Sequence, residues 1–541
     1  MRVVSSELPL LAKLQLASGT FYYVSKAQRR HRNRFQPACK FFANLCLVPD
    51  NSNQQANGPW AAKFSADSNT TPASQTDEGL SVAEKIGYGL GDTASNLYWK
   101  FFEYFQLIFY TDVFGISASA AGTMFLTTKL FDAITDPMVG LISDRTVTAW
   151  GRFRPFLLWG AIPFAVTGIF TFYTPNFSPT GKLIYAYITY AAVFMAYTVV
   201  NIPYGALMGV ISSDPVERTS VSTYRFVFAF IGAIIVQRMT EPLVAYFGGS
   251  ETQIIDGVQK IVVLDKQTGF FWTMVCYAIA AVILFVITFL STKERVQPVS
   301  SDSSQWSHDF KDLVSNGPWL VMSVFSMLQL LAGWIQGSAT AYYFTYYVGT
   351  SFGEFLVAGT FATIVGTLFA KPLRNWLGAK NLMALSSILS AILTLGFWFI
   401  GPDQIFEMYL LQVLGALVGG PLTVLMFAAY ADIADYSEWK TNRRATGLIF
   451  AAATFSQKIG SAIGGAIPGW CLASYGFISP IDGVNQQQSP ATLQGIIAMM
   501  SVFPAIALTA SALVILIYPL NRRRLAEIQA DLQTRKLSAD D

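Results

Sequence analysis

Apolar stretches long enough to cross a lipid bilayer recur along the chain from residue 85 onward, with short polar connectors between them. About 20 consecutive apolar residues span the hydrocarbon core of a bilayer as an α-helix. The pattern predicts twelve such helices, at 86–113, 118–143, 154–174, 183–211, 222–247, 270–291, 318–348, 353–375, 381–400, 405–432, 446–473 and 493–520. They form two sets of six around a longer polar connector, which predicts an all-α membrane protein.

The predicted organisation has five parts. Residues 1–80 are polar and contain no apolar run of the required length, so we expect a disordered leader or sequence upstream of the true start. A secretory signal peptide is the weaker interpretation, because Lys13 interrupts the short apolar run there. The other parts are an N-terminal six-helix bundle (81–291), a cytoplasmic connector (292–316), a C-terminal six-helix bundle (317–520) and a charged cytoplasmic tail (521–541).

Positive charges indicate the orientation. They concentrate in the connectors after the even-numbered predicted helices, as in Arg152 and Arg154, and after the last helix. Cytoplasmic loops are enriched in Lys and Arg, so both termini are expected in the cytoplasm of a multi-pass cell (inner) membrane protein. The fourth and tenth helices both run into acidic residues followed by Arg and Thr, which suggests a duplicated six-helix unit.

Composition excludes several classes of function. Hydrophobic residues make up 53% of the chain and charged residues 13%, which excludes an ordinary soluble enzyme. A formal net charge of +3 provides no basic field for nucleic acid. Two histidines and four cysteines without paired spacing do not indicate a His-based active site, a zinc site or a disulfide framework. We expect neither enzymatic activity nor a bound cofactor.

The first predicted helix carries Asp92, Asn96, Lys100 and Glu103 at offsets that place all four on one face. An ionisable group in hydrocarbon costs about 2.5–3.5 kcal/mol on insertion scales, so such residues usually line a cavity. The alternative is an intrahelical chain of pairs, Asn96–Lys100 and Lys100–Glu103, that tolerates burial.

The second predicted helix carries Lys129, Asp132 and Asp136 on one face. Two carboxylates one turn apart in a low dielectric repel, so they need a cation or a proton to coexist. We therefore expect a coupling-cation site for Na⁺, Li⁺ or H⁺ at Asp132 and Asp136. The alternative is a salt bridge to Lys129 or to another lysine, and such a bridge can alternate with cation binding.

Hydroxyl, amide and cationic groups on other helices suit a polyhydroxylated solute, because sugars are held by polar contacts and by stacking on aromatic rings. These groups are Thr198, Asn201, Arg225, Thr454 and Lys458, with Tyr98 and Trp99 as aromatic faces.

Six motifs resemble, as a set and in order, the glycoside–pentoside–hexuronide:cation symporters, the melibiose-carrier branch of the major facilitator superfamily. They begin at Tyr88 (YGLG), Tyr110 (YTDV), Asp132 (DAITDP), Trp150 (WGRFRP), Asn201 (NIPY) and Ala431 (ADIADY). The similarity runs from about residue 81 to about residue 530. It implies twelve helices in two six-helix bundles, alternating access, and sugar uptake driven by Na⁺, Li⁺ or H⁺.

The resemblance also implies roles for individual residues. Asp132, Asp136, Thr198 and Lys458 match positions of the cation site, and Arg225 matches a position of the sugar site. Further sugar-binding candidates are Asp92, Asn96, Lys100, Asn201 and Thr454, of which Lys100 is not assigned by the resemblance. Asn96 and Asn201 stand where the melibiose carrier has acids, which favours an anionic or larger sugar. A neutral oligosaccharide is the alternative.

Charged residues at the predicted cytoplasmic ends of the helices suggest a gate made of ion pairs between the two bundles. The candidates are Arg145, Arg218, Asp432, Asp435, Arg443 and Arg444. The alternative is a set of solvated loops that obey the positive-inside rule.

Three other classes compete with a cation-coupled sugar importer. A membrane enzyme acting on a lipid-linked sugar would need a catalytic acid or base near the interface, or a metal site. A receptor without flux should have lost the paired aspartates. A lipid or other organic-solute carrier of the major facilitator fold should have a more apolar cavity. The expected partners are a small-molecule sugar, the coupling cation and the lipid bilayer, and we assume a monomer.

Overall fold

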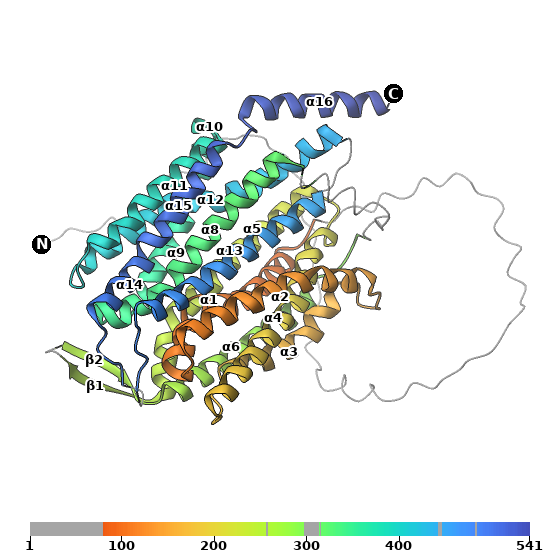
Figure 1. Ribbon diagram of the computed structural model, residues 1–541. Helices are drawn as coiled ribbons and strands as arrows, with labels where there is room; N and C mark the ends of the chain where they lie inside the picture. The colour runs from red at the N-terminus through yellow and green to blue at the C-terminus, as the bar shows by residue number, and fades with distance from the viewer. Residues whose placement is uncertain are drawn as a thin grey trace, which may run out of the picture. The chain divides into compact units, whose positions relative to one another are not determined.

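The computed structural model describes residues 79–255, 258–296, 313, 315–441, 446–481 and 484–540. The predicted leader and most of the predicted connector therefore lie outside the described residues, as do Arg443 and Arg444. Almost all of the described chain is helical (Figure 1). The first six long helices are α1 (Val82–Ile108), α2 (Ala118–Arg145), α3 (Arg154–Thr171), α4 (Pro179–Val210), α5 (Pro215–Gly248) and α6 (Lys266–Ser291). A π-helical turn, η2 (Phe109–Phe114), continues α1.

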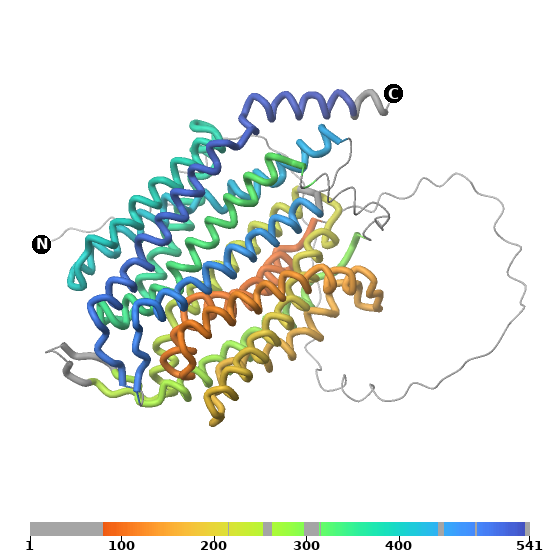
Figure 2. The backbone as a smooth tube through the Cα atoms, viewed as in Figure 1, coloured from red at the N-terminus to blue at the C-terminus, as the bar shows by residue number. Residues whose placement is uncertain are grey.

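The second half of the chain repeats this pattern, and Figure 2 follows the backbone through both halves. Its helices are α8 (Gly317–Tyr342), α9 (Gly353–Leu368), α10 (Ala370–Leu377), α11 (Ala379–Gly396), α12 (Ile405–Thr441), α13 (Thr446–Ser474), α14 (Pro490–Met500) and α15 (Val502–Leu516). Two short turns, η4 (Tyr343–Val348) and η5 (Phe397–Phe399), continue α8 and α11. The final helix, α16 (Arg522–Asp540), runs across the end of the other helices and packs on α12 (Figure 1).

Each of the twelve predicted ranges coincides with one helix or with consecutive helices. Eight helices of the described chain are long and apolar enough to span a membrane, and α9 with α10, bent by 51°, makes a ninth if the pair is one span. The predicted spans outside this set lie on α1, α2 and α13. These three helices carry the charged candidate residues, which lower their apolar character.

Local sequence explains where the helices begin and end. Ser81, Ser117 and Ser178 each accept a hydrogen bond from a backbone N–H in the first turn of α1, α2 and α4, which satisfies donors that the helix leaves unpaired. At the other end, η2 and η4 each stop at a glycine with positive φ, Gly115 at 84° and Gly349 at 80°. The same ending in both halves agrees with the predicted duplication.

One element was not predicted. The connector between α5 and α6 forms an antiparallel hairpin of β1 (Ser250–Ile255) and β2 (Val258–Val263), with Ser250 opposite Val263 and Ile255 opposite Val258. Both strands are rich in β-branched residues, which favours this pairing. The hairpin lies at the η2 end of the helices (Figure 1).

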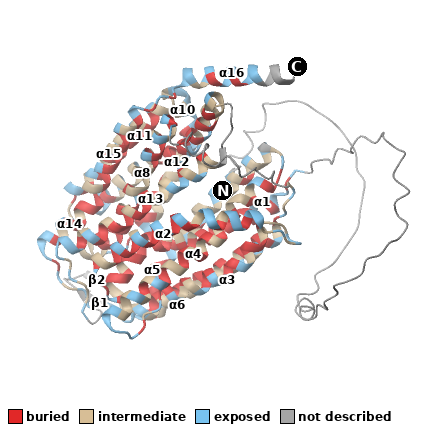
Figure 3. Ribbon diagram, turned by 45° about the vertical axis from the view of Figure 1, so that its right-hand side comes forward, coloured by how far each residue is buried: buried red, intermediate tan, exposed pale blue. Residues whose placement is uncertain are grey.

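Within the first half α1 packs against α5 and α6, and within the second half α8 packs against α13 and α15. Contacts of α2 with α13, of α1 with α8 and of α5 with α9 join the two halves. Figure 3 shows buried residues along the sides on which the helices meet and exposed residues along their outer sides. Many outer residues are large and apolar, such as Ile134 (67% exposed) and Phe399 (77% exposed). A surface of this kind requires lipid around it.

Candidate substrate and cation site

The two aspartates of α2 meet a lysine and a threonine from two other helices. Lys458 Nζ of α13 lies 2.8 Å from Asp132 Oδ2 and 2.5 Å from Asp136 Oδ2. The Thr198 hydroxyl of α4 lies 2.6 Å from Asp132 Oδ1 and 3.1 Å from Asp136 Oδ1. A hydroxyl has one hydrogen, so it donates to one carboxylate at a time. The structure thus brings together the four residues expected at the cation site.

This aspartate cluster lies where the two halves of the chain meet, because α2 and α4 belong to the first half and α13 to the second. Asp132 is almost fully buried, with 5% of its side chain exposed, whereas Asp136 retains 19%. Lys458 bridges both carboxylates, which is the predicted salt-bridge alternative. A cation that binds here must take carboxylate oxygens from Lys458, because both aspartates already contact its ammonium. The described residues contain no group of three or more His, Cys, Asp and Glu suited to a metal ion.

A second ion pair joins α1 and α5. Arg225 Nε donates to Asp92 Oδ2 at 3.0 Å, and the guanidinium lies 5.3 Å from the ring centre of Tyr204. Tyr204 stacks on Tyr88, and each hydroxyl donates to the other residue's carbonyl oxygen. Tyr88 therefore holds Tyr204 in place, and the Tyr204 ring packs against the guanidinium of the ion pair. The Asn96 amide donates to the Asp92 carbonyl oxygen within α1.

A third ion pair lies within α1. Lys100 Nζ is 2.7 Å from Glu103 Oε2 and 5.4 Å from the ring centre of Tyr104. The Lys100–Glu103 half of the predicted intrahelical chain is therefore present, whereas Asn96 bonds to Asp92 instead of Lys100. Ser338 of α8 donates to the Glu103 carbonyl oxygen at 3.3 Å, so this pair also borders the second half of the chain.

Two further sugar-binding candidates lie outside these clusters. The Thr454 hydroxyl is exposed and donates to the Phe450 carbonyl oxygen of its own helix. Asn201 is partly buried, and no hydrogen bond joins its side chain to another described residue.

Three aromatic residues connect the ion pairs, and of these the sequence singled out only Trp99. Tyr197 of α4 lies within electrostatic reach of Asp92 and Arg225 and also of the two α2 aspartates. Its ring stacks on Trp99 at 5.9 Å, and Trp99 meets Trp334 of α8 edge to face at 5.3 Å. Tyr197 is next to the candidate Thr198 in the sequence, so it could have been found there. No local signal identifies Trp334.

The predicted ion pairs between the halves are not found among the described residues. Asp432 pairs with Arg374 at 3.2 Å, and both belong to the second half. Arg145 and Arg218 form no ion pair with any other described side chain, and Asp435 is partly buried. Arg443 and Arg444 lie outside the described residues.

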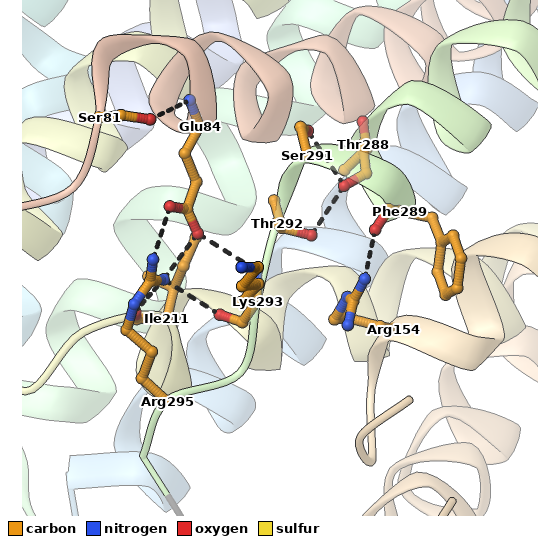
Figure 4. Close-up of polar contacts among 10 residues, drawn as sticks. All are labelled: Ser81, Glu84, Arg154, Ile211, Thr288, Phe289, Ser291, Thr292, Lys293 and Arg295. Atoms are coloured by element: carbon orange, nitrogen blue, oxygen red, sulfur yellow. Dashed lines mark hydrogen bonds and ion pairs between the residues drawn. The ribbon is translucent and has the colours of Figure 1, made fainter. Parts of the chain in front are cut away.

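At that end of the first half, ion pairs and backbone contacts hold the helices to one another instead. Glu84 at the start of α1 faces Arg295, with Oε–N distances of 2.7 and 2.8 Å, and also accepts from the Lys293 backbone N–H (Figure 4). The Glu294 carboxylate accepts from the backbone N–H groups of Arg152 and Phe153, each at 2.8 Å. The segment after α6 therefore ties α1 to the loop between α2 and α3.

The opposite end, where η2 and η4 lie, carries further polar contacts between the halves. The Thr111 and Tyr342 hydroxyls lie 2.7 Å apart, and Tyr346 donates to Asp112 at 2.5 Å. On the next pair of helices, Glu241 of α5 accepts from the backbone N–H of Gly353 at 2.9 Å and of Phe352 at 3.2 Å. Thr360 donates to Gln237 at 2.9 Å. The two halves are therefore closed against each other at the η2/η4 end.

Solved structures of transporters share this helical arrangement. A bacterial homologue of the lysosomal transporter Spinster, in an inward-facing and unoccupied conformation, matches with a TM-score of 0.56 and 14% identity, covering 81% of this chain and 98% of the other. A D-xylose–proton symporter matches with a TM-score of 0.54 and 14% identity, covering 81% and 97%. At this identity the likeness establishes the fold: an all-helical membrane protein of the major facilitator type.

Sequence relatives give the family. The family model described as MFS/sugar transport protein matches residues 87–522. The inner membrane symporter YicJ of Escherichia coli is 36% identical over 81% of this chain and 91% of its own. The isoprimeverose transporter of Lactiplantibacillus pentosus is 32% identical over 87% and 96%, and the glucuronide carrier protein homolog of Escherichia coli is 30% identical over 84% and 96%.

The chain therefore belongs to the MFS/sugar transport protein family, within the glycoside–pentoside–hexuronide:cation symporters that its motifs resemble. The predictions of the family and of cation-coupled sugar symport are confirmed at this level.

Proposed function

We propose that this transporter imports a neutral glycoside together with Na⁺ or H⁺ by alternating access. In this proposal twelve helices form two six-helix bundles in the cell membrane, with both termini in the cytoplasm. The observation that carries it is the aspartate cluster, because a carboxylate pair and its counter-cation are contributed by both halves of the chain. Movement of one half against the other must change the oxygens and charges around that pair.

Asp132, Asp136 and Thr198 supply the oxygens for the cation in this proposal, and Lys458 occupies their carboxylates when the cation is absent. The ammonium and the cation compete for the same oxygens, so cation binding releases Lys458. This exchange is the coupling device that the sequence suggested.

The sugar lies between the Asp92–Arg225 pair and the aspartate cluster. Tyr197 is within electrostatic reach of both. Asn96 and Lys100 lie on α1 with Asp92, and Asn201 lies on α4 with Tyr197. A neutral sugar is favoured because the three basic residues expected at the sugar and cation sites already have a carboxylate: Arg225 has Asp92, Lys100 has Glu103 and Lys458 has the aspartate pair. The glucuronide carrier homolog among the relatives keeps an acidic sugar as the second candidate.

The closed η2/η4 end is the extracellular end in this proposal, and the structure corresponds to the inward-facing state. Alternating access then requires that the contacts of Glu241, Thr111 and Asp112 break when the site faces outward. A membrane enzyme is a poorer interpretation, because the buried carboxylates are held in ion pairs and the relatives are transporters.

Uptake into membrane vesicles tests the proposal directly. Neutral glycosides and the matching uronides would be presented as radiolabelled substrates, each with Na⁺, with Li⁺ and with a pH gradient. We expect accumulation of a neutral glycoside against its gradient with one of these ions. A uronide that accumulates faster than its neutral counterpart would contradict the substrate class, and the absence of ion-driven uptake would contradict symport.

A further inference from the structure

Lys129 of α2 is a buried lysine whose hydrogen-bonding capacity is almost unused. Its side chain is 4% exposed, and no carboxylate lies within 4 Å of its ammonium in the described part of the chain. Its one hydrogen bond there is a long one of 3.4 Å, to the Ser461 carbonyl oxygen of α13. An ammonium carries three N–H donors, and a buried donor without an acceptor costs free energy. A bound ligand with acceptor oxygens would complete the hydrogen bonding of the Lys129 amine.

Aromatic rings from three helices surround the Lys129 ammonium. It lies 3.1 Å from the ring centre of Trp334 on α8, and 5.9 Å from the ring centres of Trp99 on α1 and Phe194 on α4. Aromatic faces attract a cation, but they accept no conventional hydrogen bond. The cluster therefore holds the charge in place and leaves N–H donors available beside two indole rings.

Gly465 of α13 leaves room at this point. A Cβ at that residue would be 3.7 Å from Lys129 Nζ and 3.7 Å from the Trp334 ring, which is ordinary van der Waals distance. Because residue 465 is a glycine, α13 places no Cβ against the Lys129 amine on this side. By contrast, a Cβ at the preceding Gly464 would come within 2.6 Å of the Leu331 carbonyl oxygen, where close helix packing requires glycine.

We infer that Trp99, Trp334 and Lys129 form a second sugar subsite, which takes the outer ring of a glycoside with two linked rings. The indoles stack on the apolar face of that ring, and the Lys129 ammonium donates to its hydroxyl oxygens. A sugar ring has both an apolar face and hydroxyl acceptors at its edge, so it satisfies the two kinds of group that meet here.

The inference rests on the proposed function, because it extends the sugar site from Tyr197 outward. Tyr197, within electrostatic reach of the Asp92–Arg225 pair, stacks on Trp99 at 5.9 Å, and Trp99 meets Trp334 at 5.3 Å. These two successive aromatic contacts, Tyr197–Trp99 and Trp99–Trp334, match the two linked sugar rings of the glycoside. In the closed arrangement the two indoles touch edge to face, so the second ring enters when α1 and α8 separate at the η2/η4 end.

Competition in membrane vesicles that carry the full chain tests this subsite. The probes are a two-ring glycoside that the wild-type protein transports and the methyl glycoside of its inner ring alone. Their inhibition constants are measured on the wild type, Trp99→Leu, Trp334→Leu and Lys129→Met. Trp159→Leu is the matched control, because that tryptophan of α3 is 51% exposed on the outer surface.

We expect the wild type to prefer the two-ring probe, and each subsite variant to lose about tenfold of that preference, as expected when one stacking or polar contact is lost. The methyl glycoside should inhibit the variants as it inhibits the wild type, and the control should behave as wild type with both probes. Equal weakening of both probes, or an unchanged preference, would overturn the subsite. A wild type that transports no sugar with any ion would instead overturn the proposed function.

A second measurement covers variants that reach the membrane in low amounts. Trp334→Phe keeps a smaller aromatic face at the same place, so its preference for the two-ring probe should fall between those of the wild type and Trp334→Leu. A preference as low as that of Trp334→Leu would show that the ring contributes packing and does not stack on the sugar.

Discussion

Replacement of Glu241 by Gln should shift the transporter toward its outward-facing state. Glu241 belongs to α5, and its carboxylate accepts the N–H groups of Gly353 and Phe352 at the start of α9. The contact therefore joins the two halves at the η2/η4 end. The start of a helix carries a partial positive charge and unpaired N–H donors, so an anionic acceptor is favoured there.

The hydrogen bonds of Glu241 determine how large a shift in the conformational equilibrium we expect. The side-chain oxygen of glutamine can still accept a hydrogen bond from the Gly353 N–H. The negative charge is lost, however, and so is the simultaneous acceptance from two N–H groups. A hydrogen bond to a charged group contributes roughly 1.5–3 kcal/mol and a neutral one about 1 kcal/mol. The difference of about 0.5–2 kcal/mol corresponds to about a 2- to 30-fold rise in the ratio of outward-facing to inward-facing molecules.

The assay follows the labelling of a cysteine in the seam, by which we mean the interface between the two halves at the η2/η4 end. Ser338 of α8 is 4% exposed and donates to the Glu103 carbonyl oxygen across the seam. In a background without the four native cysteines, Ser338→Cys would be labelled from the extracellular side with a membrane-impermeant maleimide. While the open state is the minor one, the labelling rate follows its population and should rise by the same factor in Glu241→Gln.

Glu354→Gln is the matched control, because it removes the same charge from the same seam. Glu354 faces Arg238 at 3.3 Å, but both side chains are more than half exposed. A solvated pair of this kind contributes little, so labelling should stay within about twofold of the wild type. If Glu241→Gln labels at the rate of the wild type, or no faster than Glu354→Gln, the reasoning about the closed end is refuted.

Three further predictions follow from the site and its surroundings. Asp136→Asn should reduce ion-driven accumulation of sugar to background while sugar exchange across the membrane persists, and accumulation by this variant would contradict the cation site. Gly151→Ala should destabilise the protein by about 1–3 kcal/mol, because φ is 109° there and a Cβ would lie 2.4 Å from the Glu294 carboxylate; a thermal-unfolding midpoint equal to that of wild type would contradict this. Asp432→Asn breaks the pair with Arg374, which lies within one half, so uptake should change less than twofold and a large loss would favour a gate at this residue.

Local sequence predicted the helices well, because helix formation depends on short-range patterns. Asp132 and Asp136 share a face through helical periodicity, and the Lys100–Glu103 pair follows from the same spacing. The membrane spans followed from the length of apolar runs. Where charged site residues interrupt those runs, on α1, α2 and α13, composition alone no longer identifies a span.

Contacts between distant segments could not be predicted in the same way. Asp92 and Arg225 are 133 residues apart, and Lys458 is 326 residues from Asp132. Their meeting depends on how the helices pack, which hydrophobic periodicity does not specify. For the same reason the sequence indicated an ion-pair gate at Asp432 but missed Glu241 and Trp334, whose partners lie on the other half of the chain.

The charges of the site explain why neither ligand should bind well without the other. The proposed site brings together four carboxylates and three cations: Asp92, Glu103, Asp132 and Asp136 with Lys100, Arg225 and Lys458. A cation that enters the aspartate cluster must displace the Lys458 ammonium, which then needs new acceptors in a low dielectric. Sugar hydroxyls can supply those acceptors, and they are available only when the sugar is bound. Each ligand therefore offsets a cost that the other incurs, and this reciprocal linkage couples sugar to cation within the site itself.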